Sequence, residues 1–277
     1  MYTAEISRSN PACLIFLVDR STSMAEPIGG EMPQPKAEVV ADSINRLLFE
    51  LTIKCAKETG VRDYFQVAVI GYGGTVESAF SGKLADRDLV PLSQIADNPA
   101  RVDQRIKKVP DGAGGLVDSA FSLPVWLEPA AAGGTPMTMA LRYAKSLVEN
   151  WVSEHPGSFP PIVLNLTDGQ STDGDPAEAG AEICKLTTAD GSALLFNLHV
   201  SESGGLPMTF PHSEAVLPDD YSRLLFSMSS RLPSHMRSYA NSLGHRVNDE
   251  TRGFVYNADI SAIVQFLDIG TRTSGLR

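Results

Sequence analysis

A carboxylate and two hydroxyls follow a short apolar run near the start of the chain. The run Cys13-Leu-Ile-Phe-Leu-Val18 stops at Asp19, and Ser21 and Ser23 follow at alternate positions. A continuous apolar run of this length is typical of a parallel strand buried on both faces, so Asp19 marks the carboxyl end of the strand. Ligands bind at that edge of open α/β sheets, and carboxylate and hydroxyl oxygens are donors that Mg²⁺ or Mn²⁺ accepts. The stretch therefore predicts a divalent-cation site.

Two later segments can contribute to the same site. The apolar run Pro161-Ile-Val-Leu-Asn-Leu166 ends in Thr167-Asp168-Gly169, much as the first run ends in Asp19. Gly133-Gly134-Thr135-Pro136 precedes a helical pattern, and its glycines allow a close approach of the backbone. If the two runs form neighbouring strands, Asp19 and Asp168 face each other across the crevice of the sheet.

Hydrophobic periodicity predicts the elements that position these residues. Strands are expected at residues 13–18, 63–72, 75–80, 161–166, 193–200 and 253–256, and helices at residues 35–59, 138–152, 176–186, 221–228, 234–243 and 260–267. Alternating strands and helices predict an α/β fold with a doubly wound, mostly parallel, six-stranded sheet and helices on both faces. We expect the strand order 3-2-1-4-5-6, with one antiparallel edge strand formed by the hairpin of residues 63–80.

Residues 81–134 interrupt this pattern with five prolines and only short periodic patches. They are compatible with a short helix near Leu92–Ala96 and a hairpin with arms at Val102–Val109 and Leu116–Leu123, turned at Asp111-Gly112. We expect one domain over residues 1–277, with a long insertion at 81–134 and a helical C-terminal extension at 219–277. Such a long irregular segment in a compact domain is uncommon unless it is functional, so it is a candidate for partner specificity.

Composition narrows the function classes. The chain has 277 residues, 43% hydrophobic content and a formal net charge of −10, without a Lys/Arg-rich run, which argues against nucleic acid as a partner. The cysteines Cys13, Cys55 and Cys184 form no Cys-x-x-Cys pair, which indicates reduced thiols rather than a zinc ribbon. Residues 1–10 lack an apolar signal segment, and no run approaches a membrane span. A cytoplasmic location away from membranes is expected.

The three polar segments together resemble a known family. Asp19-Arg-Ser21-Thr-Ser23, Thr135 in Gly-Gly-Thr-Pro-Met, and Asp168 in Thr-Asp-Gly resemble the metal-ion-dependent adhesion site of von Willebrand factor A-type (VWA) domains, in the order which that family uses. The resemblance covers about residues 12–200. It implies that Ser21, Ser23 and Thr135 contact a divalent ion, Mg²⁺ or Mn²⁺, through their hydroxyls, and that Asp19 and Asp168 bind the ion directly or through water.

The resemblance also implies a function. An Asp or Glu of a protein partner can replace a water on the ion, so the chain is expected to be a non-enzymatic, metal-dependent adaptor. Among stand-alone members it looks most similar to bacterial ones associated with tellurite-resistance and related stress-response gene clusters, which work beside kinases, phosphatases or ATPases. Arg20 and Thr22 depart from the small residues common in the family at these positions, which changes the local surface charge.

Other interpretations remain open at this point. A Mg²⁺-dependent phosphatase or hydrolase of the haloacid-dehalogenase type also begins with a strand ending in Asp, but it needs a second carboxylate where this chain has Ser21. Asp19, Ser21 and Ser23 alone could simply cap a turn. A neighbouring copy of the chain could supply the carboxylate from Glu26 or Glu128. The oligomeric state is not predicted.

Overall fold

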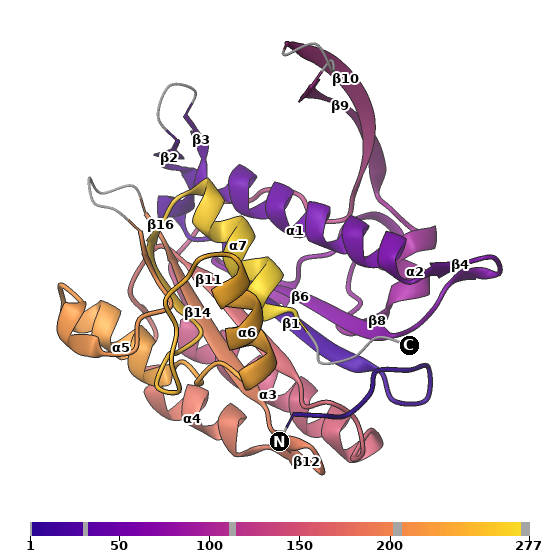
Figure 1. Cartoon of the computed structure of the whole chain (residues 1–277). Helices are drawn as coiled ribbons and strands as arrows, with labels where there is room; N and C mark the ends of the chain where they lie inside the picture. The colour runs from indigo at the N-terminus through magenta and orange to yellow at the C-terminus, as the bar shows by residue number, and fades with distance from the viewer. Residues whose placement is uncertain (1, 30–32, 111–114, 202–206, 273–277) are drawn as a thin grey trace.

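The computed structural model describes residues 2–29, 33–110, 115–201 and 207–272, and an eight-stranded sheet forms its centre (Figure 1). The parallel strands lie side by side in the order β16 (Phe254–Ala258), β14 (Leu194–Val200), β11 (Ile162–Thr167), β1 (Ala12–Asp19) and β6 (Phe65–Tyr72). Short antiparallel strands complete both sides: β15 (Met208–Thr209) pairs with β16, and β7 (Val76–Ser78) and β8 (Val90–Pro91) pair with β6.

The predicted mostly parallel sheet is confirmed, whereas its strand count is wrong. The six expected strands follow the order β7-β6-β1-β11-β14-β16, which is the predicted order 3-2-1-4-5-6. However, the sheet has eight strands instead of six, because β8 and β15 extend it, and three strands instead of one are antiparallel. Val90-Pro91 and Met208-Thr209 are each two residues long, and a strand of that length carries no readable hydrophobic period.

Helices cover both faces of the sheet, as predicted. Alternate residues of β1 point to opposite faces, so Leu14 and Phe16 belong to one apolar core and Ile15 and Leu17 to the other. The first core is covered by α1 (Lys36–Lys54), α2 (Leu92–Asp97), α6 (Ser234–Ser242) and α7 (Ile260–Gly270), and the second by α3 (Met137–Glu154), α4 (Ala177–Lys185) and α5 (Asp220–Met228). Within the described residues, none of these helices has the length and apolar character needed to cross a membrane.

The boundary of the first helix differs from the expectation. α1 ends at Lys54, whereas the apolar period predicts a helix as far as Thr59, because residues 56–61 form a small hairpin. The remaining short elements are β2 (Pro27–Ile28) with β3 (Gln34–Pro35), β4 (Ala56–Lys57) with β5 (Gly60–Val61), β12 (Thr187–Thr188) with β13 (Gly191–Ser192), and the 3₁₀ turns η1 (Thr22–Ala25), η2 (Gly82–Leu84) and η3 (Glu214–Val216).

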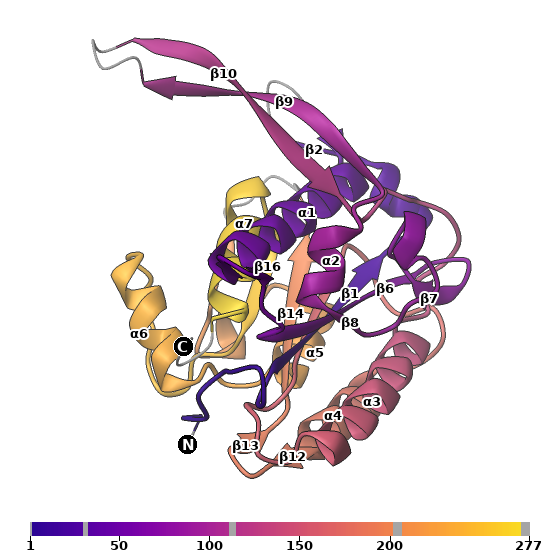
Figure 2. The ribbon, with the colours of Figure 1, turned by 90° about the vertical axis from the view of Figure 1, so that its right-hand side faces the viewer.

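A long hairpin projects from the body of the molecule and is called the hairpin arm below (Figures 1 and 2). It consists of β9 (Arg101–Pro110) and β10 (Leu116–Val125) in antiparallel register. Both predicted arms and the predicted short helix, α2, are present, while the expected turn at Asp111-Gly112 lies outside the described residues.

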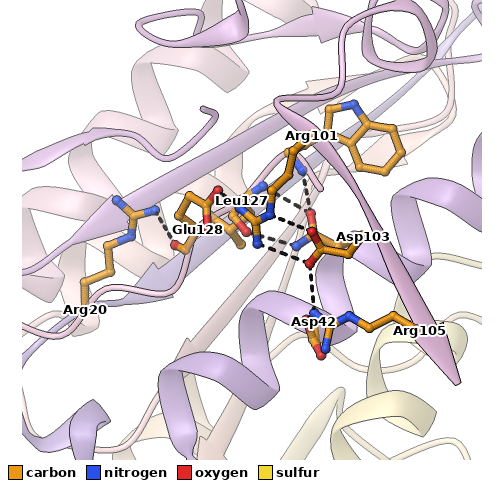
Figure 3. Close-up of polar contacts among 9 residues, drawn as sticks. Arg20, Asp42, Arg101, Asp103, Arg105, Leu127 and Glu128 are labelled. Atoms are coloured by element: carbon orange, nitrogen blue, oxygen red, sulfur yellow. Dashed lines mark hydrogen bonds and ion pairs between the residues drawn. The ribbon is translucent and has the colours of Figure 1, made fainter. Parts of the chain in front are cut away.

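Polar contacts fix the base of the hairpin arm to α1 (Figure 3). The Arg105 guanidinium donates to Asp42 of α1 over 3.2 Å, and Arg101 pairs with both Asp103 and Glu128. In the adjoining core, the buried Asn45 side chain accepts hydrogen bonds from the N–H groups of residues 126 and 127 over 2.9 and 3.1 Å. The arm is therefore held at its base, against the second and third turns of α1.

Candidate metal site

The adjacent strands β1 and β11 bring Asp19 and Asp168 to the same edge of the sheet. Val18 lies opposite Leu166 in parallel register, so the chain leaves the sheet at neighbouring points after both strands. Asp19 is the last residue of β1, and Asp168 directly follows the last residue of β11. The two carboxylates therefore meet at the carboxyl edge of the sheet, where ligands bind in open α/β folds.

Asp19 is a fully buried carboxylate, with 0% of its surface exposed. Its Oδ1 accepts a hydrogen bond from the Ser21 N–H over 2.8 Å, and its Oδ2 accepts one from the Thr167 hydroxyl over 2.7 Å. Burial raises the pKa of Asp19, although the hydrogen bonds from Ser21 and Thr167 oppose the rise. Both contacts are with neutral donors, so a divalent cation would offset the cost of burying this negative charge.

Ser21 and Ser23 connect the two halves of the site. The Ser23 hydroxyl donates to Oδ1 of Asp168 over 2.7 Å. Because its hydrogen is used in that bond, Ser21 is the donor in the 3.0 Å contact between the two serine hydroxyls. Each serine oxygen keeps lone-pair capacity for a cation, and the chain of contacts runs from the first loop to Asp168.

The Gly-Gly-Thr loop docks directly on the first loop. The N–H and the hydroxyl of Thr22 both donate to the carbonyl of Gly133 over 3.1 Å, and the N–H of Ala132 donates to the carbonyl of Arg20 over 2.6 Å. Gly133 has a φ of +89°, and a Cβ at this position would lie 2.5 Å from the backbone nitrogen of Gly74. The close approach predicted for this loop therefore needs glycine at 133, because of both the positive φ and the short distance to Gly74.

Thr135 is buried and is held by a reciprocal pair of hydrogen bonds. Its N–H donates to the hydroxyl oxygen of Thr172, and the Thr172 N–H donates to the Thr135 carbonyl, each over 2.9 Å. A Cβ placed on Gly169 would lie 3.7 Å from the Thr135 hydroxyl oxygen. The Thr135 hydroxyl therefore lies beside the residue that follows Asp168, and all five predicted ligand positions belong to one set of contacting loops.

A lysine completes the surroundings of Asp168. The Lys36 ammonium, on the first residue of α1, lies 2.9 Å from Oδ2 of Asp168 and 2.7 Å from Oε2 of Glu26. Burial by itself lowers the pKa of Lys36, but the hydrogen bonds to Glu26 and Asp168 outweigh it and raise the pKa above the ordinary value. The same ion pair lowers the pKa of Glu26. Lys36 therefore remains a cation at the edge of the site.

The sequence interpretation missed Lys36 and Thr167. Lys36 is the first residue of α1 and directly follows Pro35, and this position at a helix start next to the metal loop is its only signal in the sequence. Thr167 donates to Asp19 and also contacts the Gly169 carbonyl over 3.1 Å. It precedes Asp168 at a strand end, so its proximity to the site could have been inferred from that position.

A side chain of the loop after β11 holds the start of α3. Asp173, next to Gly174, accepts hydrogen bonds from the N–H groups of Thr138 and Met139 over 3.0 and 2.8 Å. These bonds satisfy free N–H groups in the first turn of α3 and, against the effect of burial, lower the pKa of Asp173. The loop after β11 thus holds the helix that follows Thr135.

Arg20, one of the departures from the family pattern, points away from the serines. Its guanidinium lies along β6, where a Cβ on Gly71 would be 2.6 Å from the Arg20 Cδ. Its Nη2 donates to the carbonyl of Ala79 over 3.3 Å and to the carbonyl of Glu128 over 3.4 Å. Figure 3 shows the contact with Glu128. Arg20 therefore links the first loop to the segment that follows the hairpin arm.

Aromatic residues from the C-terminal part of the chain close one side of the Asp168 loop. The Tyr221 hydroxyl of α5 donates to the Gly169 carbonyl. The imidazole of His199 stacks on Tyr256 with ring centroids 4.8 Å apart, and burial lowers the pKa of His199. The Nδ1 of His199 is buried and has no hydrogen-bond partner among the residues that the structure describes.

The local geometry does not favour simple capping as the role of the serines. Ser21 occupies the N-cap position of η1, yet its side chain makes no capping hydrogen bond and instead contacts Ser23. Within the part of the chain that the structure describes, no group of three or more His, Cys, Asp or Glu side chains is placed to hold a metal. The candidate site combines two carboxylates with three hydroxyls, all of them hard oxygen donors, which fits Mg²⁺ or Mn²⁺.

Comparisons with known proteins found neither a matching family model nor a matching curated protein. Among solved structures, the chain is similar to the vWF domain of the type V pili tip protein Mfa5 from Porphyromonas gingivalis (14% identity, TM-score 0.32), over 58% of this chain and 39% of that one. It is similar to the manganese-loaded TRAP protein of Plasmodium vivax (12% identity, TM-score 0.43), over 94% and 72% of the two chains. The pilus adhesin RrgA from Streptococcus pneumoniae matches at 17% identity and TM-score 0.31, over 62% of this chain and 22% of that one. The chain thus spans about two fifths of the Mfa5 chain and about a fifth of the RrgA chain.

Proposed function

We propose that the protein is a VWA-type binding module without catalytic activity, in which Asp19, Ser21, Ser23, Thr135 and Asp168 hold Mg²⁺ or Mn²⁺. The observation that carries this proposal is the continuous set of contacts from Asp19 through the two serines to Asp168, with Thr135 beside it. These residues come from three distant parts of the sequence and meet at the carboxyl edge of the sheet. A structural role alone does not require oxygen donors at every one of these positions.

The proposed ligands suit the binding of a partner's carboxylate better than they suit catalysis. Three of the five proposed ligands are neutral hydroxyls, so a bound ion would keep a strong attraction for one further anionic ligand. An Asp or Glu side chain of a protein partner can provide that ligand. The bound cation supplies electrostatic attraction for the carboxylate, while the protein's own loops fix the direction from which the carboxylate approaches.

A phosphatase or hydrolase of the haloacid-dehalogenase type is the alternative, and the site lacks its second carboxylate. The position two residues after Asp19 carries Ser21, whose hydroxyl contacts Ser23. Asp19 itself accepts hydrogen bonds on both oxygens and is fully buried, which suits a ligand held in place better than an exposed nucleophile.

A more specific assignment follows from the sequence resemblance alone. We propose a bacterial, cytoplasmic adaptor of the tellurite-resistance-associated type within a stress-response or signalling system. Its partner would be a protein such as a kinase, a phosphatase or an ATPase.

Metal titration followed by partner capture tests the proposed function. Calorimetric titration of Mn²⁺ and Mg²⁺ into the wild type is expected to show one saturable site, and Asp19→Asn is expected to abolish it. Capture of proteins from a bacterial extract should depend on the metal, disappear with EDTA and disappear in the variant. Asp97→Asn, which removes an exposed carboxylate on α2, is the matched control and should behave as the wild type. Wild-type protein without a saturable metal site would contradict the proposal, as would phosphatase activity that Asp19→Asn abolishes.

A further inference from the structure

A buried ammonium group sits next to a proposed metal ligand. The Lys36 side chain is 8% exposed, and its Nζ contacts Oδ2 of Asp168 over 2.9 Å, while the other oxygen of Asp168 accepts from Ser23. The Asp168 side chain has no exposed surface. A positive charge is therefore already present beside one of the two carboxylates on which a divalent ion would depend.

The second partner of Lys36 is Glu26, which is exposed to solvent, unlike Asp168. The Glu26 side chain is 65% exposed, yet its Oε2 lies 2.7 Å from the Lys36 Nζ. The Lys36 N–H also donates to the Glu26 carbonyl over 2.9 Å, which joins the start of α1 to the end of the metal loop. Glu26 thus partly neutralises Lys36 from the solvent side, and Asp168 does so from the side of the site.

We propose that Lys36 and Glu26 form a charge pair that sets the affinity of the site for its divalent cation, with Lys36 weakening binding and Glu26 strengthening it. This inference rests on the proposed function, because it assumes that Asp168 is a metal ligand. Lys36 repels an incoming cation, and its ion pair with Asp168 reduces the attraction of that carboxylate for the cation. Both effects are large where screening by solvent is weak. Glu26 acts in the opposite direction, because its negative charge offsets the positive charge of Lys36.

This arrangement has a consequence for the partner. With the cation bound, Asp19 and Asp168 balance its two charges, and Lys36 leaves a positive excess that the exposed Glu26 offsets only in part. The loaded site should therefore attract a carboxylate more strongly than the two aspartates alone would allow. Lys36 therefore lowers the affinity of the site for the cation but raises the attraction of the loaded site for a carboxylate.

The test compares two substitutions that are expected to change the Mn²⁺ affinity in opposite directions. Calorimetric titration with Mn²⁺ alone is expected to show about tenfold tighter binding for Lys36→Met and about threefold weaker binding for Glu26→Gln, while Lys36→Arg, which keeps the charge, should stay near the wild type. Lys54→Met removes a lysine from the last turn of the same helix and is the matched control, with unchanged affinity expected. Circular dichroism melts of each variant establish that it is folded.

A purely structural ion pair would behave differently. Breaking it from either side would disturb the same loop, so both substitutions would weaken Mn²⁺ binding, and that result would overturn the inference while leaving the proposed function intact. Equal affinities of Lys36→Met and wild type would also overturn it. If the wild type binds no Mn²⁺, or if Asp19→Asn leaves Mn²⁺ binding unchanged, the proposed function itself fails. That failure is distinct from the two outcomes above, in which the wild type still binds the metal.

Discussion

The side-chain amide of Asn165 donates a hydrogen bond to Oδ1 of Asn197 over 3.0 Å, between neighbouring strands in the centre of the sheet. Both asparagines are fully buried. The Tyr72 hydroxyl donates to Asn165 over 2.7 Å, and Asn197 donates to the Ser229 hydroxyl oxygen over 2.9 Å. This row of polar groups crosses β6, β11 and β14 and ends at Ser229, which directly follows α5, so it ties the C-terminal part of the chain to the strands that carry the site.

Asn197→Ala is expected to lower the free energy of unfolding by about 2–4 kcal/mol, because it leaves the buried Asn165 amide with only the weak sulfur acceptor of Met137. Urea denaturation monitored by circular dichroism measures this loss. Asn150→Ala, an exposed position on α3, should change the free energy by less than about 0.5 kcal/mol. A loss below about 1 kcal/mol in Asn197→Ala would show that the polar row contributes little.

The major strands were predictable because the two helix layers bury both faces of them. Continuous apolar runs such as Cys13–Val18 have no polar alternation, and a parallel strand in a doubly wound sheet buries such a run completely. β8 and β15 were not predictable, since each is defined by its partner strand and not by its own residues. The end of α1 at Lys54 was missed for a similar reason, because Cys55 continues the apolar period although the chain has left the helix.

The site was predictable to the extent that its residues follow strand ends. Asp19 and Asp168 were inferred from the change from apolar to polar residues, which is local in the sequence. The contacts of Lys36 with Asp168 and of Tyr221 with Gly169 depend on how α1 and α5 are placed over the sheet. Such distant pairs leave no pattern in a single sequence, so their contribution required the structure.

Thr135→Ala is expected to weaken Mn²⁺ binding about tenfold or more while changing the free energy of unfolding by less than about 1 kcal/mol. The reason is that the contacts which hold residue 135 use its N–H and carbonyl, and these remain in the variant. Titration calorimetry and urea denaturation measure the two quantities. Thr187→Ala, an exposed threonine of β12, is the control. Unchanged metal affinity in Thr135→Ala would remove this hydroxyl from the proposed ligand set.

Gly133→Ala should both destabilise the protein and impair the site. Alanine is strained at a φ of +89°, and its Cβ would press on the backbone of Gly74 from 2.5 Å, so we expect a loss of about 2 kcal/mol or more. Gly74→Ala is the matched comparison, because a Cβ there meets no atom within 4 Å. Thermal melts and Mn²⁺ titration of both variants measure the effects. Equal behaviour of the two variants would contradict the proposed close docking of the loop.

The protein is expected to lose stability as the pH falls below about 6.5, in part through His235. Burial lowers the pKa of this imidazole below its ordinary value, although its contact with the Arg272 carbonyl opposes the shift. A lowered pKa means that the unfolded chain binds the proton more readily than the native state, so the free energy of unfolding falls with pH from the unfolded pKa down to the folded one. Urea denaturation between pH 7.5 and 5 should show a shallower fall in His235→Gln than in the wild type. Equal slopes in His235→Gln and the wild type would contradict the assignment.

Shortening the hairpin arm tests whether its outer part belongs to the folding unit. Ile106 and Val117 are 72% and 47% exposed, whereas Leu123 and Val125 at the base are buried. Arg105 and Phe121 face each other in the antiparallel register, so residues 106–120 can be replaced by Asn-Gly, which favours a two-residue hairpin turn. The ion pair of Arg105 with α1 is retained in this variant.

The shortened protein is expected to keep its free energy of unfolding within about 1 kcal/mol and its Mn²⁺ affinity within about twofold, because the apolar side chains of Ile106 and Val117 in the removed segment are exposed. Val125→Ala, at the buried base, should cost about 1–3 kcal/mol, and the exposed Val117→Ala less than about 0.5 kcal/mol. Urea denaturation orders the three variants. If the shortened protein lost more stability than Val125→Ala, that result would show that the outer arm packs on the body of the protein.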